Sequence, residues 1–76
     1  MFKDLLYMNF YSDTNQSINL RITDINGREY YNLELSLKAQ EVYSHRFTEV
    51  NKFANGVYFI IVYTENDSYS RLIIKQ

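Results

Sequence analysis

Apolar and polar residues alternate along several short stretches of the chain, which is the pattern of strands with one buried face. The clearest stretch runs from Ser17 to Asp24, where Ile or Leu stands at every second position from 18 to 22. A similar alternation predicts a first strand from about Leu5 to Tyr11, and the polar segment Ser12–Gln16 predicts the turn between these strands. The pair Asn26-Gly27 follows and predicts a two-residue type I′ hairpin turn, because both residues tolerate positive φ.

The middle of the chain predicts two further strands. A strand from about Arg28 to Leu35 is expected to pair back antiparallel after the hairpin, and alternation from Glu41 to Phe47 predicts a strand at a sheet edge. Between them the pattern blurs over Ser36–Gln40, which fits either a turn of helix or a loop to another sheet. The segment Thr48–Ala54 predicts a short turn that places Val50 and Phe53, three residues apart, against the core.

The last two predicted strands are the most apolar. Val57–Thr64 is apolar on both faces, as expected for a central strand that is covered on both sides. A polar turn follows, and Tyr69–Lys75 predicts a final strand with Leu72 and Ile74 facing the core. Its basic residues Arg71 and Lys75 are then expected to face solvent. Six to seven short strands without a long amphipathic helix indicate an all-β fold, a small antiparallel Ig-like β-sandwich that occupies residues 1–76 as a single domain.

Composition and charge narrow the function. The chain has 76 residues with no cysteine and one histidine, which excludes disulfides and thiolate metal sites and leaves little scope for a catalytic triad. We therefore expect no enzyme activity and no cofactor. The formal net charge of -1 lacks the basic footprint of a nucleic-acid-binding protein. The longest apolar run, Val57–Tyr63, is far shorter than the roughly 20 residues of a membrane-spanning helix.

Individual polar residues are weak candidates for chemistry. His45, with Tyr43 and Glu41 expected on the same strand face, resembles the edge of a metal or acid–base site, but a lone strand histidine is more often a surface or rim residue. Oxygen-bearing residues in two turns lack the ordered spacing of a calcium loop. These turn residues are Asp13, Asn15 and Gln16, and Asn66 and Asp67. We interpret them as polar turn positions.

Eight tyrosines suggest an alternative function. Exposed aromatic rings on a sandwich face can stack on sugars, so the chain is alternatively a small carbohydrate- or protein-binding β-sandwich module of a surface enzyme. The residues considered for such a platform are Tyr30, Tyr31, Tyr43, Tyr63 and Tyr69. The simpler interpretation is that tyrosine fills strand positions that are half in and half out of the core.

Three segments, taken together, resemble one known family. Ile22–Glu29 contains an Asp, two further residues, and then Gly-Arg; Phe53–Val62 contains a Gly-x-Tyr box at the start of a strand; and Tyr69–Gln76 is a short basic and aliphatic strand. Their order is similar to that of the type A C-terminal sorting domain of the type IX secretion system (Por secretion system) of Bacteroidota. The residues that match the family motifs are Asp24, Gly27, Arg28, Gly56 and Tyr58.

The resemblance implies a non-catalytic secretion signal. Such a domain directs an N-terminal cargo across the outer membrane through the type IX translocon, and a surface sortase then removes it. The implied location is the periplasm in transit, and then the outer membrane, the cell surface or the extracellular space. The segment Phe2–Asp4 looks like the part just after the usual family opening, so Met1 is expected to stand where a larger protein was cut.

The expected recognition surface is the last strand with the hairpin before it. An edge strand offers unpaired backbone groups that a partner can extend by strand addition. The residues assigned to translocon recognition are Asn66, Asp67, Arg71, Leu72, Ile73, Ile74, Lys75 and Gln76. Gly56 and Tyr58 are expected to maintain the fold.

Overall fold

The computed structural model describes residues 2, 5–47 and 50–76, and these residues form six strands and one short 3₁₀ helix. The predictions that involve residues 1, 3, 4, 48 and 49 lie outside this part of the chain. The elements are β1 (Leu6–Tyr11), β2 (Gln16–Asp24), β3 (Glu29–Leu37), β4 (Val42–Phe47), η1 (Val50–Lys52), β5 (Gly56–Tyr63) and β6 (Ser68–Lys75). Each predicted strand exists, and the segment that blurred before residue 40 divides into the end of β3 and a loop.

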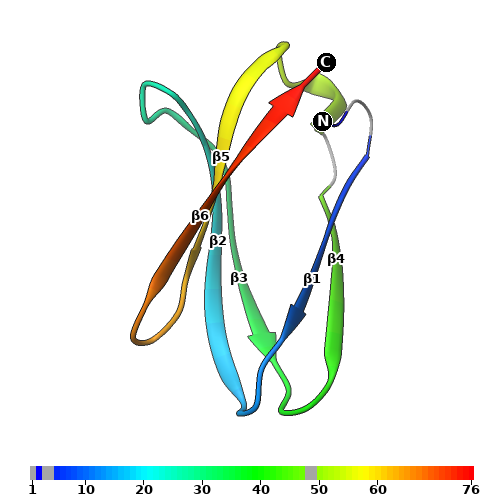
Figure 1. Ribbon diagram of the computed structural model, residues 1–76, viewed down its shortest axis with the longest axis vertical. Coiled ribbons are helices and arrows are strands. Elements are labelled where there is room, and N and C mark those ends of the chain that lie inside the picture. Colours follow the sequence, from blue (N-terminus) through cyan, green and yellow to red (C-terminus); the bar gives the residue numbers. More distant parts are fainter. Residues whose placement is uncertain (1, 3–4, 48–49) are drawn as a thin grey trace.

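The strands form two antiparallel sheets that face each other (Figure 1). One sheet has the order β1-β4 and the other the order β3-β2-β5-β6. Strands β1 and β2 follow each other in the chain but lie in different sheets, as do β3 and β4. This interleaved pairing of β1 with β4 and of β2 with β5 is that of an immunoglobulin-like Greek key, so the predicted all-β sandwich is confirmed.

The core lies between the sheets, and β2 and β5 supply its centre. Leu20 and Ile22 on β2 are fully buried and lie opposite Val62 and Ile60 on β5. Phe47, the last residue of β4, closes this core from the two-stranded sheet. Burying one such aliphatic or aromatic side chain stabilises the fold by about 1.5–3 kcal/mol, so the alternation in β2 and β5 is the main source of stability.

The hairpin between β2 and β3 differs from the predicted two-residue turn. The N–H of Gly27 donates to the carbonyl of Asp24 at 3.1 Å, and the N–H of Asp24 donates to the carbonyl of Arg28 at 3.0 Å. Gly27 has a φ of +85°, whereas Asn26 is not among the residues with positive φ. The loop therefore has three residues, and a shift in register follows between Ile22 and Thr23. A left-handed glycine closes this type of loop with a β-bulge.

The outer face of β5 is not covered, in contrast to the prediction for this strand. The two-stranded sheet packs only against the inner face of the larger sheet (Figure 1). On the outer face, Phe59 and Ile61 are half-buried, and Val57 and Tyr63 are 37% and 39% exposed. The central position of β5 between β2 and β6 is as predicted, but apolar residues on both faces did not imply a second covering layer.

The two ends of the described chain meet at one end of the sandwich (Figure 1). Phe2 forms a parallel bridge with Lys75. Its N–H donates to the carbonyl of Ile74 at 2.9 Å, and its own carbonyl accepts the N–H of Gln76 at 2.9 Å. The Phe2 side chain is 6% exposed and belongs to the core, so this residue anchors the start of the chain to the last strand.

Candidate functional site

The aspartate of the first family motif organises the β2–β3 hairpin. Its Oδ1 atom accepts the backbone N–H groups of Asn26 at 2.9 Å and Arg28 at 3.0 Å, and its Oδ2 atom accepts the hydroxyl of Tyr30 at 3.1 Å. Desolvation raises the pKa of Asp24, but these hydrogen bonds to the ionised carboxylate outweigh it, and the pKa is lowered overall. Asp24 therefore acts as a structural residue of the turn, and Gly27 provides its left-handed conformation.

The glycine–tyrosine motif joins β5 to the segment before it. Gly56 has a φ of +153°, and a Cβ built on it would meet no atom within 4 Å. The requirement for glycine is therefore conformational, because the space around it is open. Tyr58 is 4% exposed, and its hydroxyl donates to the carbonyl of Ala54 at 2.6 Å. Its ring also contacts Phe53 and Tyr30 at centroid distances of 5.2 and 5.5 Å.

Strand β6 lies at the edge of the four-stranded sheet, and its register with β5 decides which side chains are buried. Ile73 lies opposite the buried Tyr58 and packs against the core. Leu72 and Ile74 point to the outer face and are 53% and 38% exposed, whereas Lys75 is only 7% exposed. The predicted orientation of Leu72, Ile74 and Lys75 is therefore wrong by one residue. In a run of three apolar residues, each one is suited to burial, so the register with the neighbouring strand decides which of them faces the core.

The two basic residues of β6 have different environments. Lys75 buries its aliphatic stem, and its ammonium donates to the carbonyl of Gln76 at 3.1 Å. Arg71 is on the same side of the strand as Ile73 but remains exposed. No carboxylate of the described residues forms an ion pair with its guanidinium. Arg71 thus remains available for a contact outside the domain.

The hairpin before β6 is held by a threonine. The Thr64 N–H donates to the carbonyl of Asp67 at 2.8 Å, and the Asp67 N–H donates to the Thr64 hydroxyl oxygen at 3.0 Å. The side chains of Asn66 and Asp67 are exposed, as expected for turn positions. The hairpin and the exposed residues of β6 therefore follow each other along the sheet edge, whereas Ile73 packs against the core and Lys75 is buried.

His45 forms part of an aromatic cluster rather than a chemical site. Its Nε2 atom lies 3.1 Å from the hydroxyl of Tyr31, and its ring packs edge-on against Phe47 at 4.8 Å and parallel to Tyr43 at 6.1 Å. Partial burial lowers the pKa of His45, which favours the neutral imidazole. Glu41 lies outside β4. Within the described ranges, no group of three or more acidic, histidine or cysteine side chains is placed to hold a metal ion.

The five tyrosines considered for a sugar platform do not share one surface. Tyr30 packs against Phe53 and Tyr58, and Tyr31 packs against Phe47. Tyr43 stacks on His45, and the Tyr63 ring lies under the Arg21 guanidinium at 5.0 Å on the outer face. Tyr69 borders the space between the sheets. Tyr31 and Tyr43 share one cluster around His45, and the other three tyrosines pack elsewhere, in agreement with the simpler interpretation of their number.

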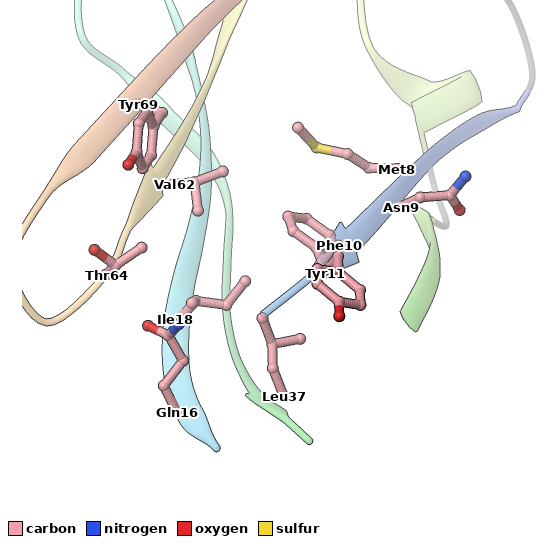
Figure 2. A pocket seen from close by; sticks show the side chains of 10 residues that line it. All are labelled: Met8, Asn9, Phe10, Tyr11, Gln16, Ile18, Leu37, Val62, Thr64 and Tyr69. Atoms are coloured by element: carbon pink, nitrogen blue, oxygen red, sulfur yellow. The ribbon is translucent and has the colours of Figure 1, made fainter. Parts of the chain in front are cut away.

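Sequence patterns did not indicate a cavity of about 300 Å³ between the sheets (Figure 2). Met8 and Phe10 of β1 form one wall, and Val62 and Tyr69 of the larger sheet face them. The cavity exists because the smaller sheet has two strands and the larger has four, so β1 leaves part of the inner face near β6 uncovered. Such a difference in width has no local signal in the sequence.

The fold and its motifs define a small immunoglobulin-like sandwich in which the distinctive Asp, Gly and Tyr residues hold turns and strand ends. Comparison with protein families identifies the type more closely. The family model for the secretion system C-terminal sorting domain matches residues 2–76. The chain therefore belongs to the type IX secretion C-terminal sorting domain family. None of the curated proteins and none of the solved structures compared with the chain is a match.

Membership of this family indicates a sorting signal for type IX secretion. It implies a cargo region on the N-terminal side, secretion machinery as a partner, and transport toward the outer membrane or the extracellular space. In the described residues, no helix is both long and apolar enough to cross a membrane.

Proposed function

We propose that this domain is a non-catalytic secretion signal that the type IX translocon reads from its folded surface in the periplasm. The family match over residues 2–76 carries this proposal. The translocon then moves the N-terminal cargo across the outer membrane, and a surface sortase removes the domain. The recognition surface consists of the β5–β6 hairpin and the exposed residues of β6.

The position of β6 supports this choice of surface. It is an edge strand, its central residues Arg71 and Leu72 are exposed, and Arg71 pairs with no carboxylate of the described residues. The outer face beside it adds further half-exposed apolar side chains from β5. The edge strand thus presents exposed apolar side chains on its outer face and an arginine on its inner side, and exposed apolar side chains together with arginine are typical of a protein interface.

The direct test is a secretion assay in a bacterium that has the type IX system. Residues 1–76 are fused to the C-terminus of a fluorescent protein that carries a periplasmic export signal. We expect fluorescence at the cell surface or in the medium for the intact domain. Deletion of Leu72–Gln76 should retain the fusion in the periplasm, and secretion that survives this deletion would exclude the last strand as the signal.

Because that deletion also removes Ile73 from the core, point variants must separate recognition from folding. Arg71→Glu changes an exposed residue of β6 and should reduce secretion while the melting temperature of the domain stays near that of the wild type. Arg46→Glu makes the same charge change on an exposed residue of β4 and serves as the matched control. Equal secretion of the two variants would contradict recognition through β6.

Removal by a sortase is tested on the cargo itself. The mass of the secreted fluorescent protein should correspond to the passenger without the 76-residue domain. A sortase-deficient strain should accumulate the uncleaved fusion. Recovery of the full fusion from the surface of a strain with active sortase would show that the domain is retained.

A further inference from the structure

The outer edge of β6 is only partly occupied. On one side β6 pairs with β5 along its whole length. On the other side, within the described part of the chain, its only backbone partner is Phe2, which bonds the carbonyl of Ile74 and the N–H of Gln76. Phe2 therefore covers the last part of this edge, and the earlier part has no backbone partner among residues 2, 5–47 and 50–76.

The bonds to Phe2 also show which residues of β6 present their backbone to the open side. Backbone N–H and C=O groups of one residue point to the same side of a strand, and successive residues alternate. Since Ile74 and Gln76 face Phe2, the even-numbered residues Ser70 and Leu72 face the open edge as well. The odd-numbered residues, such as Arg71, direct their backbone toward β5. The N–H and C=O groups of Ser70 and Leu72, and the N–H of Ile74, therefore point to the open edge and are available to a binding partner.

We propose that the secretion machinery binds this domain by adding an extended strand to β6 along Ser70–Ile74. This inference rests on the proposed function and specifies its mode of recognition. The bound segment is short, because Phe2 occupies the edge beyond the N–H of Ile74. Recognition is carried mainly by the backbone of Ser70 and Leu72.

The side chains of β6 define the chemistry of the partner strand. Side chains directly beside each other on adjacent strands point to the same face of the sheet. The residue beside Leu72 therefore lies on the outer face, next to the exposed Leu72 side chain, where an apolar side chain is favoured. The residue beside Arg71 lies on the inner side, next to a guanidinium without an ion-pair partner in the described residues. An acidic side chain at that position complements the charge.

Proline substitution tests the backbone directly. Ser70→Pro removes an N–H that faces the open edge, where proline is tolerated, so the fold should persist. Ser70→Ala changes the same exposed side chain but keeps the N–H. In the secretion assay, we expect Ser70→Pro to lose secretion and Ser70→Ala to be secreted like the wild type. The melting temperature of each purified variant shows whether the domain is folded.

A second proline controls for general effects on the sheet. Glu34 is exposed on β3, the other edge strand of the same sheet. The backbone N–H of Asp24 points to β3, so the backbone groups of the other even-numbered residues of β2, such as Leu20, point to β3 as well. Leu20 pairs with Leu33, whose backbone groups therefore point back to β2. The backbone groups of the next residue, Glu34, then point away from the sheet. Glu34→Pro should therefore be secreted normally.

Three results would overturn the proposal. The first is normal secretion of a folded Ser70→Pro variant. The second is a loss of secretion with Ser70→Ala as large as with Ser70→Pro, which would indicate recognition of the side chain. The third is a loss of secretion with Glu34→Pro as large as with Ser70→Pro. If Ser70→Pro does not fold, Leu72→Pro against Leu72→Ala repeats the comparison at the next open-edge residue. In each of these cases secretion of the wild-type fusion still supports the proposed function, whereas a wild-type fusion that stays in the periplasm contradicts that function itself.

Discussion

At the scale of single residues, three motif positions of the family are explained by local geometry. Asp24 accepts hydrogen bonds that close a three-residue loop, Gly27 closes the loop with positive φ, and Gly56 starts β5 with a φ of +153°. None of these roles requires a ligand. At these three positions the motifs therefore specify the shape of the domain, and the proposed recognition surface on β6 is separate from them.

Gly56→Ala should destabilise the domain even though space is available for the added methyl group. A backbone conformation that is nearly exclusive to glycine costs a residue with a Cβ about 1–3 kcal/mol. Urea unfolding of the purified domain measures the change in the free energy of unfolding. Gly27→Asn is the matched control and should cost less, because Asn tolerates the left-handed conformation at a φ of +85°. An unchanged stability of Gly56→Ala would contradict the conformational argument.

The stability of the domain should decrease in acid through Asp24. The pKa of Asp24 in the folded chain is lower than its ordinary value of 3.8. The ionised carboxylate therefore contributes fully to the free energy of unfolding above pH 3.8, and this contribution is lost as the pH falls through the lower pKa of the folded state. The melting temperature of the wild type should therefore fall more steeply below about pH 4 than that of Asp24→Asn, which no longer titrates at this site. Parallel curves for the two proteins would exclude this residue as a source of acid sensitivity.

At the scale of elements, the edge strand β6 depends on β5 for its orientation. Alternation alone does not orient Leu72-Ile73-Ile74, because each residue of this run is suited to burial. Pairing with Tyr58 turns Ile73 inward, and the adjacent residues then face outward. The same dependence explains why Lys75, a residue type that usually faces solvent, is buried at the end of the strand.

Serine substitutions distinguish the observed orientation from the opposite one. Ile73→Ser removes a partly buried side chain that packs against the core and should lower the free energy of unfolding by about 1–2 kcal/mol, less than the loss of a fully buried side chain. Leu72→Ser alters a residue that is 53% exposed and should change stability by about 0.5 kcal/mol or less. Chemical denaturation of both variants provides the comparison, and a larger loss for Leu72→Ser would mean that the register is shifted.

At the scale of the whole molecule, the two ends of the chain support each other. Phe2 fills the end of the core and pairs with the last residues, although 72 positions separate Phe2 from Ile74 in the numbering (74 − 2). The N-terminal side, where family membership places the cargo, therefore lies beside the end of β6, the proposed recognition strand. Loss of Phe2 would both weaken the core and extend the open edge of β6.

Deletion of residues 1 and 2 should expose the end of β6 selectively. The amide hydrogen of Gln76 loses its acceptor and should exchange rapidly with solvent, whereas that of Arg71, which faces β5, should remain protected. Hydrogen exchange followed by NMR measures both sites. Phe2→Leu keeps the backbone acceptor and most of the buried volume, so it should preserve protection at Gln76. Continued protection of Gln76 in the deletion variant would show that Phe2 is not its partner.

The sequence by itself determined the strands and the sandwich class, because period-two alternation and turn residues are local signals. The family was indicated separately, by the resemblance of three short motif segments, and the family model matches residues 2–76. It also identified Gly56 and Tyr58 as residues that maintain the fold. Only the tertiary structure decided the facing of β6, the three-residue hairpin loop, the uncovered outer face of β5 and the pairing of Phe2 with Lys75. These features depend on which segments distant in sequence pair with each other, and the type of an apolar residue does not specify which segment will bury it.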